Sequence, residues 1–160
     1  MSDEDTLDAL ADAIATLPEP VAAAAAAVEL ARAEGDATGI RKRAFELGIA
    51  VVRYGVSVGL ALLSEKLGEQ RAPKPLQRSL GGAARMSDGQ WCELLRAVGA
   101  QVEERSLFRF ASNKPVAELV RARNRFAHEG TRGDEAPGCA QSVLEDAREL
   151  LALPLRVVAS

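Results

Sequence analysis

Residues 47–63, LGIAVVRYGVSVGLALL, form a nearly uninterrupted apolar stretch that decides how the rest of the chain is interpreted. The stretch approaches the length of a membrane span, and the basic run Arg41-Lys42-Arg43 precedes it. Arg53 at its centre would cost about 2.5–3.5 kcal/mol in a bilayer, however, and the stretch is shorter than the usual ~20 residues. We therefore expect the central helix of a soluble bundle and no membrane segment.

The sequence on either side of this stretch also predicts helices. It lacks the alternation of apolar and polar residues that predicts strands. Ser87-Asp88-Gly89-Gln90 has the form of a capping box, and Pro154 predicts a bend in the last helix. Apolar spacing places the helices at about 38–68, 76–80, 87–98, 115–129 and 137–158. Together they predict an all-α fold, an antiparallel up-and-down bundle of four main helices over residues 37–160.

The first 36 residues differ from the rest in charge and composition. They hold nine acidic residues against a single base, Arg32. An alanine-rich run from residue 21 to residue 34 follows the interruption Pro18-Glu19-Pro20. Alanine has a high helix propensity but offers little side chain for packing. We therefore expect residues 1–36 to form an acidic, alanine-rich helical arm that docks weakly on the body or binds a partner protein.

The scarcity of histidine and cysteine excludes several kinds of site. The chain has one histidine, His128, and two cysteines, Cys92 and Cys139, separated by 46 residues. This set has neither the close spacing of metal ligands nor that of a redox pair. Gly81-Gly82 lacks the lysine and serine that end a phosphate-binding loop. We expect no metal and no cofactor, and the acidic N-terminus, unlike a secretory signal, favours the cytoplasm.

Positive charge gathers between residues 105 and 132. This segment holds seven basic and two acidic residues, and such a cluster can bind a polyanion such as RNA. The alternative is a solvated basic face without a ligand. The candidates for RNA contact are Arg109, Lys114, Arg121, Arg125 and Arg132.

One charge is out of place in the helix predicted from residue 114 to residue 130. Val116 and Leu119 begin its inward stripe, and Arg123 occupies a position where that stripe calls for an apolar residue. A guanidinium group that is half-buried in a bundle needs a partner. We expect either a carboxylate such as Glu46 or Glu93, a carbonyl at a helix end, or a phosphate in a cleft or subunit interface.

The end of this helix also gathers groups suited to RNA chemistry. Asn124 and His128 share a face at i,i+4 spacing, and Arg121 joins that face. Histidine moves protons near neutral pH, and arginine binds phosphate in a fork and stabilises its developing charge. The 2′-hydroxyl of RNA can serve as the nucleophile, so phosphodiester transfer needs no serine, cysteine or metal from the protein.

Residues 123–128, RNRFAH, resemble the R-x4-6-H motif of the HEPN superfamily, in which a polar residue often follows the arginine. The upstream segment at residues 87–95, SDGQWCELL, is similar to an opening found in bacterial HEPN-like domains. The resemblance spans roughly residues 38–158. It implies a helical bundle that forms a homodimer with two motifs facing one cleft, and a metal-independent endoribonuclease that leaves a cyclic phosphate. The resemblance implies that the residues matching the motif, Arg123, Asn124 and His128, are the catalytic residues.

The resemblance also implies a cellular setting, and it leaves other functions open. Many HEPN domains serve in bacterial antiviral defence, toxin–antitoxin or RNA-processing systems, and others persist as non-catalytic dimerisation or adaptor modules. An adaptor would recruit a protein partner through its bundle or through residues 1–36. In a third hypothesis, the acidic arm shields the basic site in cis, and its removal strengthens RNA binding at low salt.

Overall fold

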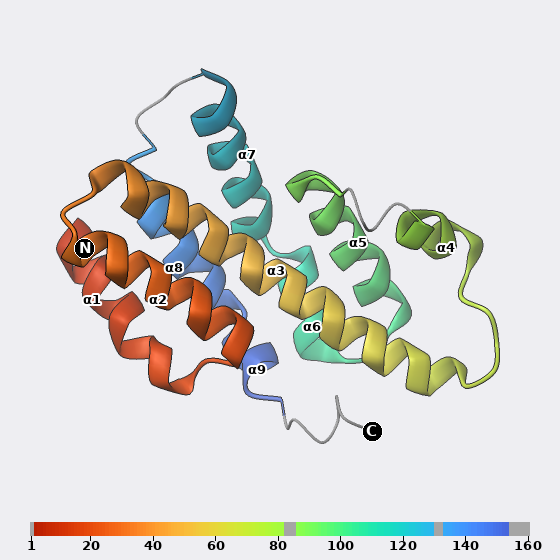
Figure 1. The fold of residues 1–160 in the computed structure, drawn as a ribbon. Coiled ribbons are helices and arrows are strands. Elements are labelled where there is room, and N and C mark those ends of the chain that lie inside the picture. Colours follow the sequence, from red (N-terminus) through yellow and green to blue (C-terminus); the bar gives the residue numbers. More distant parts are fainter. Residues whose placement is uncertain (1, 82–85, 130–132, 154–160) are drawn as a thin grey trace.

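The computed structural model describes residues 2–81, 86–129 and 133–153 of the chain. Within these residues it holds helices and turns but no strand, so the predicted all-α class is confirmed. Figure 1 labels the helices, whose bounds are α1 (Asp3–Ala13), η1 (Ile14–Thr16), α2 (Glu19–Ala33), α3 (Ala37–Leu67), α4 (Lys74–Gly81), α5 (Asp88–Gln101), α6 (Arg105–Ser112), α7 (Lys114–Glu129), α8 (Ala136–Asp146) and α9 (Arg148–Leu151).

Helix α3 is the central helix of the molecule. It begins where the Asp36 side chain accepts a hydrogen bond from the amide of Gly39 at 2.9 Å, and it crosses the whole fold in Figure 1. It is long and apolar enough to cross a membrane, but 56% of its most apolar window is buried inside the protein. Helices α2, α5, α7 and α8 all pack against it. The apolar stretch therefore forms the core helix of a bundle, as the sequence predicted.

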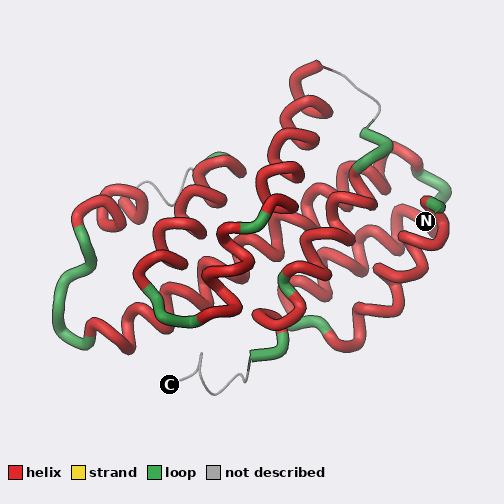
Figure 2. Tube along the Cα trace, turned by 180° about the vertical axis from the view of Figure 1, so that it is seen from behind, coloured by secondary structure: helices red, strands yellow, loops and turns green. Residues whose placement is uncertain are grey.

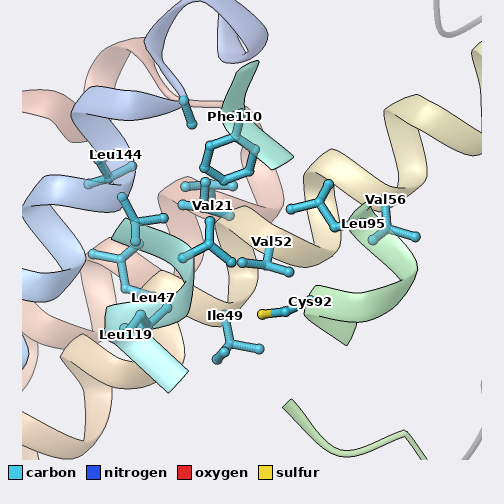
Figure 3. Packing of buried hydrophobic residues seen from close by; sticks show 14 of the residues in the cluster. Val21, Leu47, Ile49, Val52, Val56, Cys92, Leu95, Phe110, Leu119 and Leu144 are labelled. Atoms are coloured by element: carbon cyan, nitrogen blue, oxygen red, sulfur yellow. The ribbon is translucent and has the colours of Figure 1, made fainter. Parts of the chain in front are cut away.

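The core is continuous along α3. Figure 3 shows Leu47 and Val52 of α3 among apolar side chains from the helices that cover it, including Leu95 of α5 and Phe110 of α6. All four of these side chains are at most 1% exposed. The core thus brings together helices from both halves of the sequence.

Two glycines on α3 let other helices approach it closely. A β-carbon built at Gly48 would lie 2.6 Å from Leu119 Cδ2 of α7. A β-carbon at Gly59 would clash with Val98 of α5. Real β-carbons do not approach other atoms so closely, so a side chain at either position would force Leu119 or Val98 to shift. The contact at Gly48 lets α7, the helix that carries the motif, lie close to α3.

The expected weak docking of residues 1–36 is wrong. Val21, Ala25 and Val28 of α2 are at most 1% exposed and belong to the same core as α3. Leu10 of α1 is equally buried, and α1 packs on α8. Small alanine side chains between the valines let α2 lie close along α3, so the alanine run is a packing surface. Residues 1–36 and the body share one hydrophobic core.

The later helices confirm some sequence predictions and correct others. Ser87 and Gln90 form the expected capping box, with the Ser87 amide donating to Gln90 Oε1 at 2.8 Å. The short helix α6 was not predicted. The last helix breaks at Ala147, where α8 gives way to α9, close to the point where Asn113 donates to Asp146 Oδ1 at 2.7 Å. The bend predicted at Pro154 lies outside the described residues.

Candidate functional site on and beside α7

Helix α7 is anchored at one end and projects at the other. In its first half Val116, Leu119 and Ala122 are at most 1% exposed. Pro115 lies in its first turn, where a missing amide leaves no hydrogen bond unmade. Figures 1 and 2 show the second half extending beyond the ends of the neighbouring helices, while Arg123 still contacts α5 and Phe126 still contacts α3. The motif residues lie on this projecting half.

One face of the projecting half carries an exposed polar stripe. Arg121, Asn124, Arg125 and His128 are all exposed, and their spacing of three, four and seven residues places them on one side of the helix. The structure therefore brings together Asn124 and His128 of the predicted catalytic set, with Arg121 and Arg125 of the predicted RNA-binding set. An imidazole, an amide and guanidinium groups on one accessible surface can bind a phosphodiester and transfer protons.

Arg123 faces elsewhere and has a partner that the sequence analysis did not name. Its Nε donates to Asp88 Oδ2, in the first turn of α5, at 2.7 Å. The partner is a carboxylate, one of the kinds expected, but it is neither of the two named examples, since Glu46 accepts from Arg43 on its own helix at 2.8 Å. Five helical positions turn a side chain through about 140°, so Arg123 and His128 do not share a face of one chain.

A cleft of about 580 Å³ opens on the side of α7 where Arg123 lies. Helix α3 forms one wall, α7 forms another, and Asp88 of α5 contributes as well. The side chains of His128 and Asn124 do not line it. The lining residues are Lys42, Phe45, Glu46, Ile49, Arg53, Asp88, Arg123, Phe126 and Ala127.

The predicted RNA-binding residues do not form one patch. Arg109 on α6 lies 3.6 Å from Glu149, and Lys114 at the start of α7 lies 3.5 Å from Glu118. About 21 Å of helix separates Lys114 from His128. On the projecting half, Arg125 lies 3.4 Å from Glu135, whereas Arg121 makes no ion pair with any residue that the structure describes. Arg132 lies outside the described residues.

The two thiols are poorly suited to nucleophilic chemistry. Burial raises the pKa of the Cys92 thiol to about 11, and burial also raises the pKa of Cys139. A thiol in this state holds its proton at neutral pH. In the described ranges, no three metal-ligating side chains come together.

Three residues that line the cleft carry no functional signal in the sequence. Asp88 was identified only as part of a capping box, Phe126 only as a core residue, and Arg53 only as an obstacle to membrane insertion. Only the fold shows that they belong together, because they lie on three different helices that meet at the cleft. Comparison with family models, curated proteins and solved structures finds no match to this chain.

Proposed function

We propose that the protein is a metal-independent endoribonuclease whose chemistry is centred on the projecting half of α7. The observation that carries this proposal is the exposed stripe, where His128, Asn124 and Arg121 lie on one face. The RNA 2′-hydroxyl attacks the adjacent phosphorus, the bond to the 5′-oxygen breaks, and a 2′,3′-cyclic phosphate forms. One proton leaves the 2′-hydroxyl and another reaches the departing 5′-oxygen.

Each residue of the stripe has a defined part in this scheme. His128 transfers protons, and Asn124, one turn earlier, orients the imidazole or the RNA. Arg121 binds the phosphate from the same face and stabilises its developing charge. Arg123 acts as a positioning residue, because its bond to Asp88 holds α7 against α5. The residues that act on RNA thus lie on one face of α7, and the positioning residue Arg123 lies on another.

A homodimer supplies the second proton-transfer group. The reaction needs one group that takes a proton and one that gives it, and each chain has one histidine. Two copies that bring their projecting helices together place two copies of His128 near one phosphate. We propose that this dimer acts in the cytoplasm, in a bacterial defence or toxin-like system.

The test is cleavage of a labelled RNA of mixed sequence in the presence of EDTA. We expect cleavage by the wild-type protein and a loss of at least about 100-fold in His128→Ala, the usual contribution of general acid–base catalysis. Because His128 is exposed, this variant should keep wild-type helicity and oligomeric state. Arg78→Ala is the control, since it removes an exposed cation of α4 that lies in neither the stripe nor the cleft, and it should leave the rate unchanged.

Two results would contradict the proposal. One is the absence of cleavage by a folded wild-type protein. The other is wild-type cleavage by His128→Ala. Arg121→Ala and Arg123→Ala separate the two arginine roles, since the first should lower the rate without changing stability and the second should change both.

The exposed side chain of Leu30 favours a second candidate, a non-catalytic adaptor. Leu30 lies on α2 within the acidic region and is 61% exposed, although its helix is otherwise packed through Val21, Ala25 and Val28. An adaptor would bind a partner protein at this point. It predicts that His128→Ala is silent in RNA assays while Leu30→Ser, which leaves the fold intact, weakens a complex with the partner.

A further inference from the structure

The cleft beside α7 follows a single stripe of α3. Lys42, Phe45, Glu46, Ile49 and Arg53 line it at spacings of three or four residues, so they lie on one side of the helix. Arg53 follows Lys42 by eleven residues, which corresponds to about 16 Å along the helix. The cleft is therefore an elongated trough, and its volume of about 580 Å³ lies in the range that holds ligands of drug size or larger.

The trough presents free positive charge at both ends. Its two carboxylates are already engaged, Glu46 with Arg43 and Asp88 with Arg123. Lys42 and Arg53 are exposed, and neither forms an ion pair with another residue in the described part of the chain. The two side chains whose charge is left for a ligand are therefore both cations, and they lie about 16 Å apart along α3.

Between these two cations the trough has a rigid aromatic floor. Phe45 is 3% exposed, and its ring lies 5.4 Å from that of Phe126, centroid to centroid. Gly133 supports Phe126 from another side, since a β-carbon there would lie 2.6 Å from Phe126 Cδ2. Phe126 itself is half-buried and lines the trough. Its ring therefore packs against both Phe45 and Gly133.

At one end of the trough Arg53 has an aromatic partner. Its guanidinium carbon lies 5.4 Å from the centroid of the Trp91 ring, and Trp91 follows Asp88 by three residues at the start of α5. A cation stacked on an aromatic ring keeps its charge available to an anion. Trp91 is the chain's only tryptophan, so its fluorescence can report on whatever binds Arg53.

From these contacts we propose that the trough binds about two or three nucleotides of single-stranded RNA, with phosphates at Lys42 and Arg53 and a base against Phe126. The inference rests on the proposed function and names an accessory site on the face of α7 opposite His128. Aromatic side chains with flanking cations bind single strands because unpaired bases expose their faces, whereas those of a duplex are stacked. An acidic peptide would use the cations but would gain little from the aromatic floor.

The experiment measures binding separately from cleavage. The His128→Ala variant, which should not cleave RNA, is titrated with an oligoadenylate of five nucleotides while Trp91 fluorescence is recorded. Fluorescence anisotropy of a dye-labelled copy of the same strand gives the dissociation constant. We expect a saturable change in Trp91 emission. The logarithm of the dissociation constant should rise with the logarithm of salt concentration with a slope of about 1.4, as expected for two phosphate contacts to a single strand.

Variants in the His128→Ala background then test the two ends and the floor. Lys42→Ala and Arg53→Ala should each raise the dissociation constant about tenfold and lower the salt slope by about 0.7. Phe126→Leu, chosen because it preserves an apolar core contact, should raise it about tenfold through lost stacking. Arg78→Ala is the control and should bind like its parent, because Arg78 is an exposed cation of α4 that does not line the trough. Anisotropy is the readout for Arg53→Ala, since that substitution alters the surroundings of Trp91 directly.

Four outcomes would overturn the inference. The first is unchanged binding in both Lys42→Ala and Arg53→Ala. The second is an affinity for adenosine monophosphate equal to that for the oligoadenylate. The third and fourth are competition as strong as that of the unlabelled oligoadenylate by a duplex of the same length or by an oligoglutamate peptide. Failure of cleavage by the wild-type protein, with trough binding intact, would contradict only the proposed ribonuclease. If the wild-type protein cleaves RNA but the trough substitutions leave RNA binding unchanged, only the proposed trough site would be contradicted.

Discussion

Arg123 of α7 donates from Nε to Asp88 Oδ2 of α5 across 2.7 Å, and the carboxylate of this pair is much less exposed than the guanidinium. The bond joins the helix that carries the proposed catalytic stripe to the first turn of α5. Charge-assisted hydrogen bonds are stronger than neutral ones, and partial burial reduces solvent screening. The pair therefore fixes the angle at which α7 leaves the bundle.

Asp88→Asn should lower the free energy of unfolding by about 1 kcal/mol, because it removes the charge that Arg123 faces. Urea unfolding followed by circular dichroism measures the change. The double variant with Arg123→Ala should show a coupling energy of similar size. Glu118→Gln breaks the more exposed pair with Lys114 and should change stability by no more than about 0.5 kcal/mol. Equal effects from the two pairs would show that the Asp88 contact is an ordinary surface contact.

Val28→Ala should lower the free energy of unfolding by about 1–3 kcal/mol, since it leaves a cavity between α2 and α3. Leu30→Ala on the same helix is the control, because Leu30 is 61% exposed while Val28 is fully buried. Thermal or urea unfolding of both variants gives the comparison. A neutral Val28→Ala would contradict a stabilising contact between α2 and α3 at this residue.

Gly59→Ala should destabilise the protein although alanine favours helix. The new methyl group would clash with Val98, whose β-branched side chain has little rotamer freedom on a helix. Gly138→Ala is the matched control in α8, where a β-carbon would meet no atom within 4 Å. It should stabilise by about 0.5–1 kcal/mol. Calorimetric melting should therefore move in opposite directions for the two substitutions.

Stability should fall with rising pH above pH 9 because of Cys92. Burial raises its pKa from the ordinary 9.0 to about 11, so between these values the unfolded chain loses the proton and the native protein keeps it. The stabilisation is complete below pH 9 and is lost as pH rises toward 11. Relative to Cys92→Ala, the wild type should lose about 1 kcal/mol between pH 9 and pH 10. Parallel stability curves for the two proteins would contradict this.

Local signals predicted the parts of the fold that depend on neighbouring residues. The apolar run over residues 47–63 predicted α3, and Ser87 with Gln90 predicted the start of α5, because period and capping are properties of a short segment. The role of α2 could not be obtained in this way. Val21 and Val28 lie two turns apart, but only their packing on α3 shows that the alanines between them form a contact surface.

The candidate site was predicted in part. The exposed stripe with Asn124 and His128 follows from helical spacing alone. The partner of Arg123 does not, because Asp88 is 35 positions away in sequence and meets it only when α5 and α7 converge. The trough is likewise invisible in the sequence, since Lys42, Arg53 and Phe126 come together only through the crossing of α3 and α7.

The packing of α8 on both α1 and α3 has a consequence for synthesis. Helices α1 and α3 leave the ribosome well before α8 (Ala136–Asp146), which packs on both of them. This part of the core closes only after α8 has been made. Contacts between such distant segments slow folding compared with helical proteins built from local pairs, so the nascent N-terminal half exposes apolar surface on which chaperones can act.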